Sequence, residues 1–180
     1  MFPSHILPAD GARGRGERGA APVTMGAAKL DLVLLALEAL TGITSEAMLQ
    51  TAQEVGAAPI LRDRVTLWRL RQANPWRRGR GRKGLDLEEA QALVAVGTRL
   101  AQQHHATIRA AVAAWEEGQL HHPPLVDYLE RFADLWRDRL QPAAPSTMEA
   151  MALKLLVDLL FYGGPAGPQR LWLALLEEAG

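Results

Sequence analysis

The chain contains no cysteine, which excludes a disulfide scaffold, a thiolate metal site and a cysteine nucleophile. Serine is almost as scarce, since it occurs only at Ser4, Ser45 and Ser146, and the last two are positioned as helix caps. The sequence therefore gives no support to a Ser-His-Asp catalytic triad.

Residues that favour β-sheets are also few. Val, Ile and Thr together supply 21 of the 180 residues, whereas Leu and Ala supply 59. This ratio favours helices and leaves little material for a sheet. We predict an all-α protein with a single compact domain of six or seven helices, built around a long central helix.

Long uninterrupted apolar runs are absent as well. Residues 1–24 lack the apolar segment of a secretory signal peptide. The most apolar runs, residues 32–37 and 153–162, are too short to cross a bilayer, and charged residues lie beside or within them. We expect a cytoplasmic protein that does not insert into membranes.

Residues 1–26 are rich in Gly, Arg and Pro, and we expect them to form a disordered tail before a helical domain of residues 27–180. Two interpretations of the tail stay open. Its three Arg-Gly pairs could bind RNA, or the native protein starts at Met25 and the residues before it are not part of it.

Start and stop signals predict seven helical segments in the domain. They cover residues 28–40, 45–56, 59–74 and 86–117, a segment that begins at Pro123, and residues 146–162 and 168–178. The fourth is the longest, because a capping-box pattern starts it at Asp86 and it could run to Glu117, just before Gly118. Within it, Gly97 predicts a close helix crossing or a kink.

The third segment carries an apolar stripe of Leu61, Val65 and Trp68 at helical spacing, and we expect this stripe to pack on the core. Arginines lie along both of its flanks. They are Arg62 and Arg69 on one side, and Arg64 and Arg71 on the other. The segment would therefore present two rows of guanidinium groups beside a buried stripe.

The net charge is zero, but the charges are unevenly placed. Residues 60–84 contain nine basic residues and one acidic residue, whereas residues 85–180 carry a net charge of −6 and residues 1–59 one of −2. A local positive field can attract an anionic partner even when the total charge vanishes. The alternative is that the basic segment neutralises acidic helices of its own chain.

Three stretches carry a resemblance to a known family. They are residues 30–42 (LDLVLLALEALTG), residues 62–75 (RDRVTLWRLRQANP) and the loop through Lys83, Gly84 and Leu85. With them, the chain resembles a family of small uncharacterised cyanobacterial proteins, a domain of unknown function, over roughly residues 28–178. The resemblance implies a cyanobacterial cytosolic context and assigns no activity, cofactor or catalytic residue.

The main candidate site is the basic segment of residues 60–84. Its partner-binding residues are predicted to be Arg62, Arg64, Arg69, Arg71, Trp76, Arg77, Arg78, Arg80, Arg82 and Lys83. The loop from Trp76 to Gly84 is not a phosphate-binding Walker motif, because the final Lys-Ser/Thr is missing. Four interpretations stay open: a solvated or internally paired loop, an acidic protein partner, RNA or DNA with Trp76 stacking on a base, and a small anion.

Other candidate chemistry is weak. His104 and His105 are adjacent on a helix and point about 100° apart, so they are poorly placed to bind one ion, and His121 and His122 fit a loop. The paired glutamates at helix ends are expected to be solvated, and the tryptophans other than Trp76 to pack in the core. We expect no metal, no cofactor and no catalytic residue.

These observations favour a non-enzymatic protein-interaction module. Residues 60–84 would bind an acidic protein surface, with the loop cations attracting the partner and the helix arginines forming bidentate contacts to carboxylates. RNA or DNA binding by the same surface is the alternative, and a homodimer is compatible with the sequence.

Overall fold

The computed structural model describes residues 24–79 and 84–179 of the chain. Within these ranges the secondary structure consists of eight α-helices and one isolated backbone bridge. The helices are α1 (Thr24–Thr41), α2 (Ser45–Glu54), α3 (Arg64–Arg71), α4 (Leu87–Gln103), α5 (His105–Glu116), α6 (Pro123–Arg139), α7 (Pro145–Tyr162) and α8 (Gly167–Ala179). The prediction of an all-α domain is confirmed.

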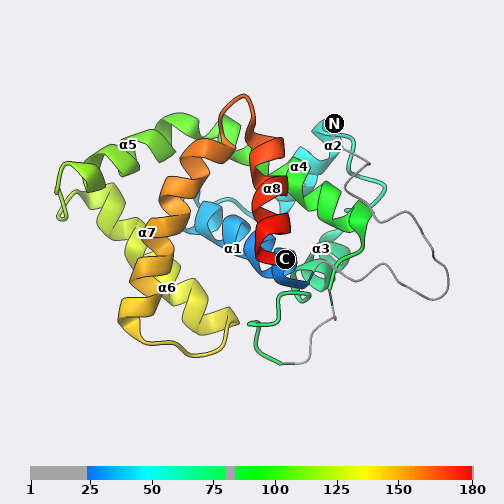
Figure 1. The fold of residues 1–180 in the computed structure, drawn as a ribbon, viewed down its shortest axis with the longest axis horizontal. Coiled ribbons are helices and arrows are strands. Elements are labelled where there is room, and N and C mark those ends of the chain that lie inside the picture. Colours follow the sequence, from blue (N-terminus) through cyan, green and yellow to red (C-terminus); the bar gives the residue numbers. More distant parts are fainter. Residues whose placement is uncertain (1–23, 80–83, 180) are drawn as a thin grey trace.

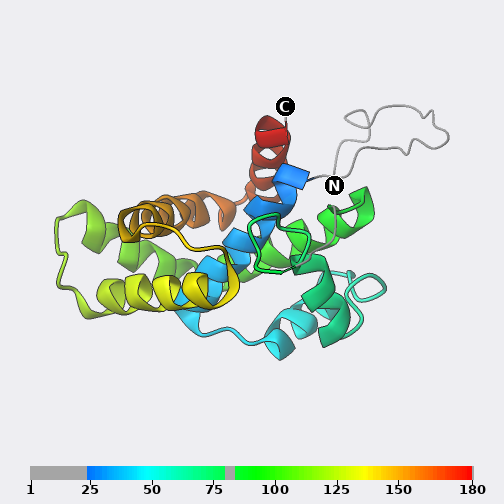
Figure 2. The same ribbon diagram turned by 90° about the horizontal axis from the view of Figure 1, so that it is seen from below.

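Helix α1 runs through the middle of the molecule in both ribbon views (Figures 1 and 2) and packs against α4, α6, α7 and α8. It is apolar on nearly all sides, and every residue from Leu32 to Leu37 is at most 3% exposed. Helices α2 and α3 lie at one end of the molecule, and α5 lies at the opposite end. Burial of an all-round apolar helix therefore organises the fold.

No single helix in the described part of the chain is both long and apolar enough to span a membrane.

Side-chain caps define three of the helix starts. Thr44 accepts a hydrogen bond from the Ala47 amide at α2, and Asp63 accepts one from the Thr66 amide at α3. Asp86 and Glu89 form the predicted reciprocal capping box at α4. Because Asp63 is the N-cap, α3 begins at Arg64 and not at Pro59, where the sequence predicts its start.

The single long helix predicted for residues 86–117 is wrong, because the chain is broken at His104 into α4 and α5. His104 leaves the helical conformation, with φ −109° and ψ 22°. The break lies beside the C-terminus of α7, where the backbone of Gly163 approaches the carbonyl of Ala101. The domain thus has eight helices in its described residues, and α1 is its central helix.

The packed face of α3 also differs from the prediction. Leu61 is buried but precedes the helix, whereas Val65 and Trp68 are 67% and 60% exposed. The buried face carries Leu67 and Leu70 instead. Leu61 therefore does not share a helix face with Val65 and Trp68, which turn outward because Leu67 and Leu70 pack on the core.

The expected tail falls almost wholly outside the described residues, and α1 begins at Thr24, within the segment assigned to that tail. The loop residues 80–83 also lie outside the described ranges. The prediction of disorder for residues 1–23 is therefore not tested by the structure.

Two glycines differ in the space around them. A Cβ atom at Gly97 would lie 3.6 Å from Val33 Cγ1, which is an ordinary contact. A Cβ atom at Gly163 would lie 2.8 Å from the Ala101 carbonyl oxygen and 2.9 Å from the His105 ring. The close approach predicted for Gly97 is therefore made by Gly163.

We predict that Gly163→Ala lowers the free energy of unfolding by about 1–3 kcal/mol, because the backbone of α4 must move to admit the methyl group. Chemical denaturation measures this change. Gly97→Ala is the matched control, and it should be neutral or stabilising by up to about 1 kcal/mol, since alanine is the better helix former. Equal effects of the two substitutions would contradict the packing described for Gly163.

Candidate functional site

A buried carboxylate on the central helix collects several residues of the basic segment. Asp31 is 2% exposed. Its Oδ1 atom accepts hydrogen bonds from Arg71 Nε at 2.7 Å and Arg77 Nη2 at 2.6 Å. Its Oδ2 atom accepts from Arg77 Nε at 2.7 Å and Asn74 Nδ2 at 2.9 Å. Arg77 thus binds Asp31 with two parallel hydrogen bonds, which is the strong bidentate geometry.

A second carboxylate extends this cluster toward the surface. Glu38 lies two helical turns after Asp31 on α1, so the two acids share a face of that helix. Its Oε1 atom accepts hydrogen bonds from Arg71 Nη2 at 3.0 Å and from Arg139 Nη1 at 2.8 Å. Arg71 therefore bridges both acids, and Arg139 ties the end of α6 to α1.

The ionisation of the cluster follows from these contacts. Burial alone would raise the pKa of Asp31, but Arg71, Arg77 and the hydrogen bond from Asn74 lower it below its usual value. Burial opposes the charge of Arg71, yet attraction to Asp31 and Glu38 raises its pKa above the usual value. Both groups are therefore charged at neutral pH.

Backbone hydrogen bonds hold the start of the loop in place. The Arg78 amide donates to the Arg139 carbonyl at 3.0 Å, and the Gln141 amide donates to the Trp76 carbonyl at 2.8 Å. The Arg78 side chain donates to the Leu140 carbonyl at 2.9 Å. These hydrogen bonds join the segment after α3 to the segment after α6 and direct the Arg77 side chain toward Asp31. Trp76 and Arg78 stay exposed.

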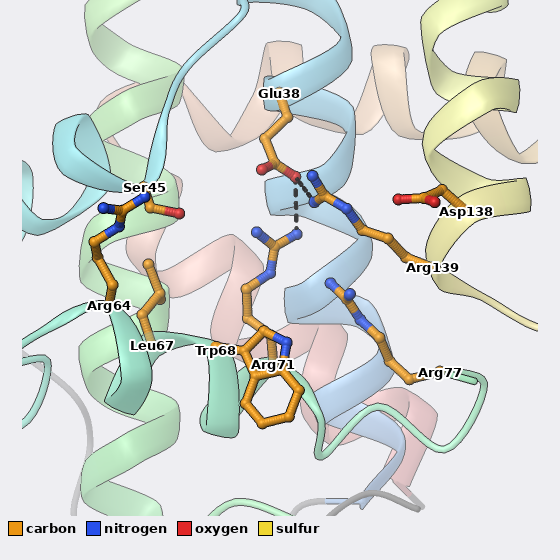
Figure 3. A pocket seen from close by; sticks show the side chains of 9 residues that line it. All are labelled: Glu38, Ser45, Arg64, Leu67, Trp68, Arg71, Arg77, Asp138 and Arg139. Atoms are coloured by element: carbon orange, nitrogen blue, oxygen red, sulfur yellow. Dashed lines mark hydrogen bonds and ion pairs between the residues drawn. The ribbon is translucent and has the colours of Figure 1, made fainter. Parts of the chain in front are cut away.

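A cavity of about 300 Å³ opens above the cluster. Figure 3 shows Arg71 and Arg139 pointing toward Glu38, with Arg77 reaching toward the same region from the loop. Trp68 and Leu67 of α3 line the cavity as well. We refer to this cavity as the arginine pocket.

The surface beside the arginine pocket is unusually apolar for a basic segment. Six large apolar side chains are exposed among the described residues, and three of them, Val65, Trp68 and Trp76, lie on α3 or just after it. Residues three and four apart on a helix are neighbours, so Arg64 and Arg69 flank Val65 and Trp68. We call these four residues the outer face of α3.

The predicted site residues take different roles in the structure. Arg71 and Arg77 are each only 6% exposed and are paired with Asp31, so they do not belong to the exposed rows of guanidinium groups that the sequence predicts. The alternative of pairing within the chain holds for these two. Arg64 is exposed and pairs with Glu46 at 3.0 Å.

Arg62 and Arg69 are exposed and form no ion pair with another described residue. Arg80, Arg82 and Lys83 lie outside the described residues. The exposed and described part of the predicted site therefore comprises Arg64 and Arg69 on the outer face of α3, together with Arg62, Trp76 and Arg78.

The histidines do not converge. No group of three or more His, Asp or Glu side chains within residues 24–79 and 84–179 is arranged to hold a metal ion. His104 separates α4 from α5, and His105 contacts the side chain of Arg109 on the same helix.

Sequence reasoning missed the acidic half of the cluster. Asp31 and Glu38 are the acids in a largely apolar helix, and a carboxylate buried in such a helix must find a positive partner. That rule, applied together with the excess of arginine in residues 60–84, could have identified the pairing. Nothing in the sequence pattern indicates which arginines pair, or that Asn74 and Arg139 join them.

We predict that Asp31→Asn lowers the free energy of unfolding by about 3–5 kcal/mol, because it leaves Arg77 buried without a counter-charge and Arg71 with only Glu38. Urea denaturation measures the loss. Asp127→Asn, the same change at an exposed position on α6, is the control and should alter stability by less than about 0.5 kcal/mol. A loss at Asp31 no greater than that of the control would show that the cluster is not stabilised by this charge.

Lowering the pH should remove the stabilisation that the ionised Asp31 side chain gives to the folded state. Because the pKa of Asp31 is lowered in the folded state, its stabilisation is present above its unfolded value, about 4, and is lost as the pH falls through the folded value. Asp63, whose pKa is also lowered through its hydrogen bonds with Thr66, adds to the wild-type slope.

Unfolding measured from pH 5 to pH 3 should therefore show a steeper loss of stability in the wild type than in Asp31→Asn. Both proteins retain Asp63, so the difference between their slopes isolates Asp31. Parallel curves would mean that Asp31 is not held ionised by its neighbours.

Comparison with known proteins identifies a family to which no activity is assigned. No curated protein matches the chain, and no solved structure matches it. The family model described as "Protein of unknown function (DUF3038)" matches residues 24–177, which covers all eight helices except the last two residues of α8. The resemblance noted from the sequence is confirmed in this respect, and the chain belongs to the DUF3038 family of proteins of unknown function.

Proposed function

We propose that this protein is a non-enzymatic interaction module that binds an acidic segment of a protein partner through the outer face of α3. The observation that carries the proposal is the exposure of Val65 and Trp68, at 67% and 60%, between arginines on a helix whose other face is buried. Tryptophan and arginine are the residues most enriched in the energetic centres of protein interfaces.

The buried arginines support this function by fixing the position of α3. Arg71 fixes the rotation of α3 by bonding Asp31 and Glu38 on α1. Trp68 lies one helical turn before Arg71. The contacts of Arg71 with α1 fix the rotation of the helix, and they therefore also keep Trp68 on its exposed side. An exposed aromatic on a rigid element loses little conformational entropy on binding, which favours affinity.

Charge favours an acidic protein segment over nucleic acid. Binding to a nucleic acid backbone needs a row of free cations that contact successive phosphates. Among the described residues of the basic segment, Arg71 and Arg77 are neutralised, Arg64 is paired with Glu46, and Asp138 lines the adjacent pocket. Alternating acids and arginines beside apolar side chains match a protein surface better than a polyphosphate.

We also propose that the protein comes from a cyanobacterium and works in the cytoplasm, as the sequence predicts. A second copy of the chain is a weaker candidate for the partner, because the outer face of α3 carries cations that would repel their copies across a twofold interface.

The proposal predicts that Trp68→Ala weakens partner binding at least about tenfold, because a central interface tryptophan is typically worth 2 kcal/mol or more. Arg69→Glu should weaken it further by reversing the local charge. The measurement is affinity capture from a nuclease-treated lysate of the source organism over a salt series, followed by titration of the recovered protein against each variant.

Leu120→Ala and Arg109→Glu are the matched controls. Both residues are exposed, and both lie on or after α5, at the end of the molecule opposite α3. They should leave binding unchanged. Capture that occurs only when the nuclease is left out, or equal binding by Trp68→Ala and the wild type, would reject the proposed function.

A further inference from the structure

The arginine pocket holds more hydrogen-bond donors than its own carboxylates use. Arg71, Arg77 and Arg139 together donate five hydrogen bonds to Asp31 and Glu38. Each guanidinium has five N–H groups, so most of these donors remain available. Nη1 of Arg71, Nη1 of Arg77, and Nε and Nη2 of Arg139 have no partner among the described residues.

These nitrogens can be reached from the pocket. No free guanidinium nitrogen of the three arginines is sealed from solvent in the described part of the chain. All three side chains line the cavity, and Figure 3 shows their guanidinium groups directed toward the region below Glu38. Arg71 and Arg77 are held almost immobile by Asp31, so the donors are preorganised.

The charge of the cluster is not balanced. Three guanidinium groups and two carboxylates are linked by ion pairs, which gives a formal charge of +1 in a site whose arginines at positions 71 and 77 are 94% buried. Partial burial strengthens the attraction to an anion, because water screens it less. Asp138 lines the same cavity but forms no ion pair with these groups, so the ion-paired cluster itself lacks one negative charge.

The number and shape of the charges favour a carboxylate. A planar carboxylate matches the fork of a guanidinium and carries the single charge that the cluster lacks. A phosphate carries up to two negative charges and would meet Glu38 and the exposed Asp138, which lines the same cavity. Trp68 and Leu67 supply an apolar wall for the methylene groups that precede a carboxylate.

We propose that the arginine pocket binds one carboxylate, the side chain of an Asp or Glu in the partner segment that docks on the outer face of α3. The source of this carboxylate rests on the proposed function, whereas the site itself does not. The bound group accepts hydrogen bonds from Arg77 and Arg139, and Arg71 contributes its charge from below. Asp138 opposes binding by like-charge repulsion.

The site is tested with small probes on the full chain, so that it does not depend on finding the partner. The probe is N-acetylglutamate N-methylamide, which carries one side-chain carboxylate, and the neutral glutamine analogue is its control. The guanidinium resonances of Arg77 and Arg139 and the indole resonance of Trp68 are followed by NMR during titration. We expect saturable shifts with the glutamate probe in the millimolar range and none with the glutamine probe.

Two variants sharpen the test. Arg139→Gln removes donors from a side chain that is 31% exposed and should weaken probe binding about tenfold while the fold is kept. Asp138→Asn removes the opposing charge and should strengthen it about two- to threefold. Melting curves of both variants confirm that they are folded. The opposite responses of the two variants separate anion binding from a general loss of structure.

Three results would overturn the inference. An absence of saturable shifts, or equal shifts with the glutamine probe, would remove the carboxylate site and leave the proposed function of the outer face of α3 untouched. Tighter binding of inorganic phosphate would replace the assigned ligand chemistry. Tighter binding of free succinate than of the glutamate probe would show that the site serves a free dicarboxylate and not a partner side chain.

Discussion

The structure depends on the burial of a single carboxylate in the central helix. Asp31 lies in a helix whose neighbouring side chains are apolar and fully enclosed, so its charge must be compensated inside the protein. The compensating groups come from α3 and from the loop that follows it. Asp31 therefore fixes the positions of two segments that few apolar contacts would otherwise hold to α1.

The same contact explains why the basic segment divides into two parts. Arg71 and Arg77 are drawn inward, and their neighbours in the sequence are left on the surface as a consequence of helix and loop geometry. Trp68 and Trp76 are among the side chains left exposed in this way. Structural and exposed arginines are thus interleaved in one stretch of sequence.

Most of the fold could be predicted from the sequence, because its signals are local. Composition predicts the helices, and the capping box at Asp86 sets a start that the structure confirms, whereas Ser45 and Ser146 lie within α2 and α7 and do not cap them. The break at His104 could not be predicted, since no proline or glycine marks it and the segment that packs beside it, at Gly163, is distant in sequence. The pairing of Asp31 with Arg71 and Arg77 is likewise long-range, with separations of 40 and 46 residues.

Buried ion pairs of this kind contribute more to the choice of one structure than to its stability. Turning Val65 and Trp68 toward the core would expose Leu67 and Leu70 and would break the hydrogen bonds from Arg71 to Asp31 and Glu38. The bond from Arg71 to Asp31 opposes this rotation and keeps α3 in the orientation in which Trp68 faces solvent. The buried charges of Asp31 and Arg71 thus maintain the exposed aromatic face of α3, although their burial costs stability. The excess of one positive charge in the cluster also makes the surface beside that face electropositive, which an apolar core could not do.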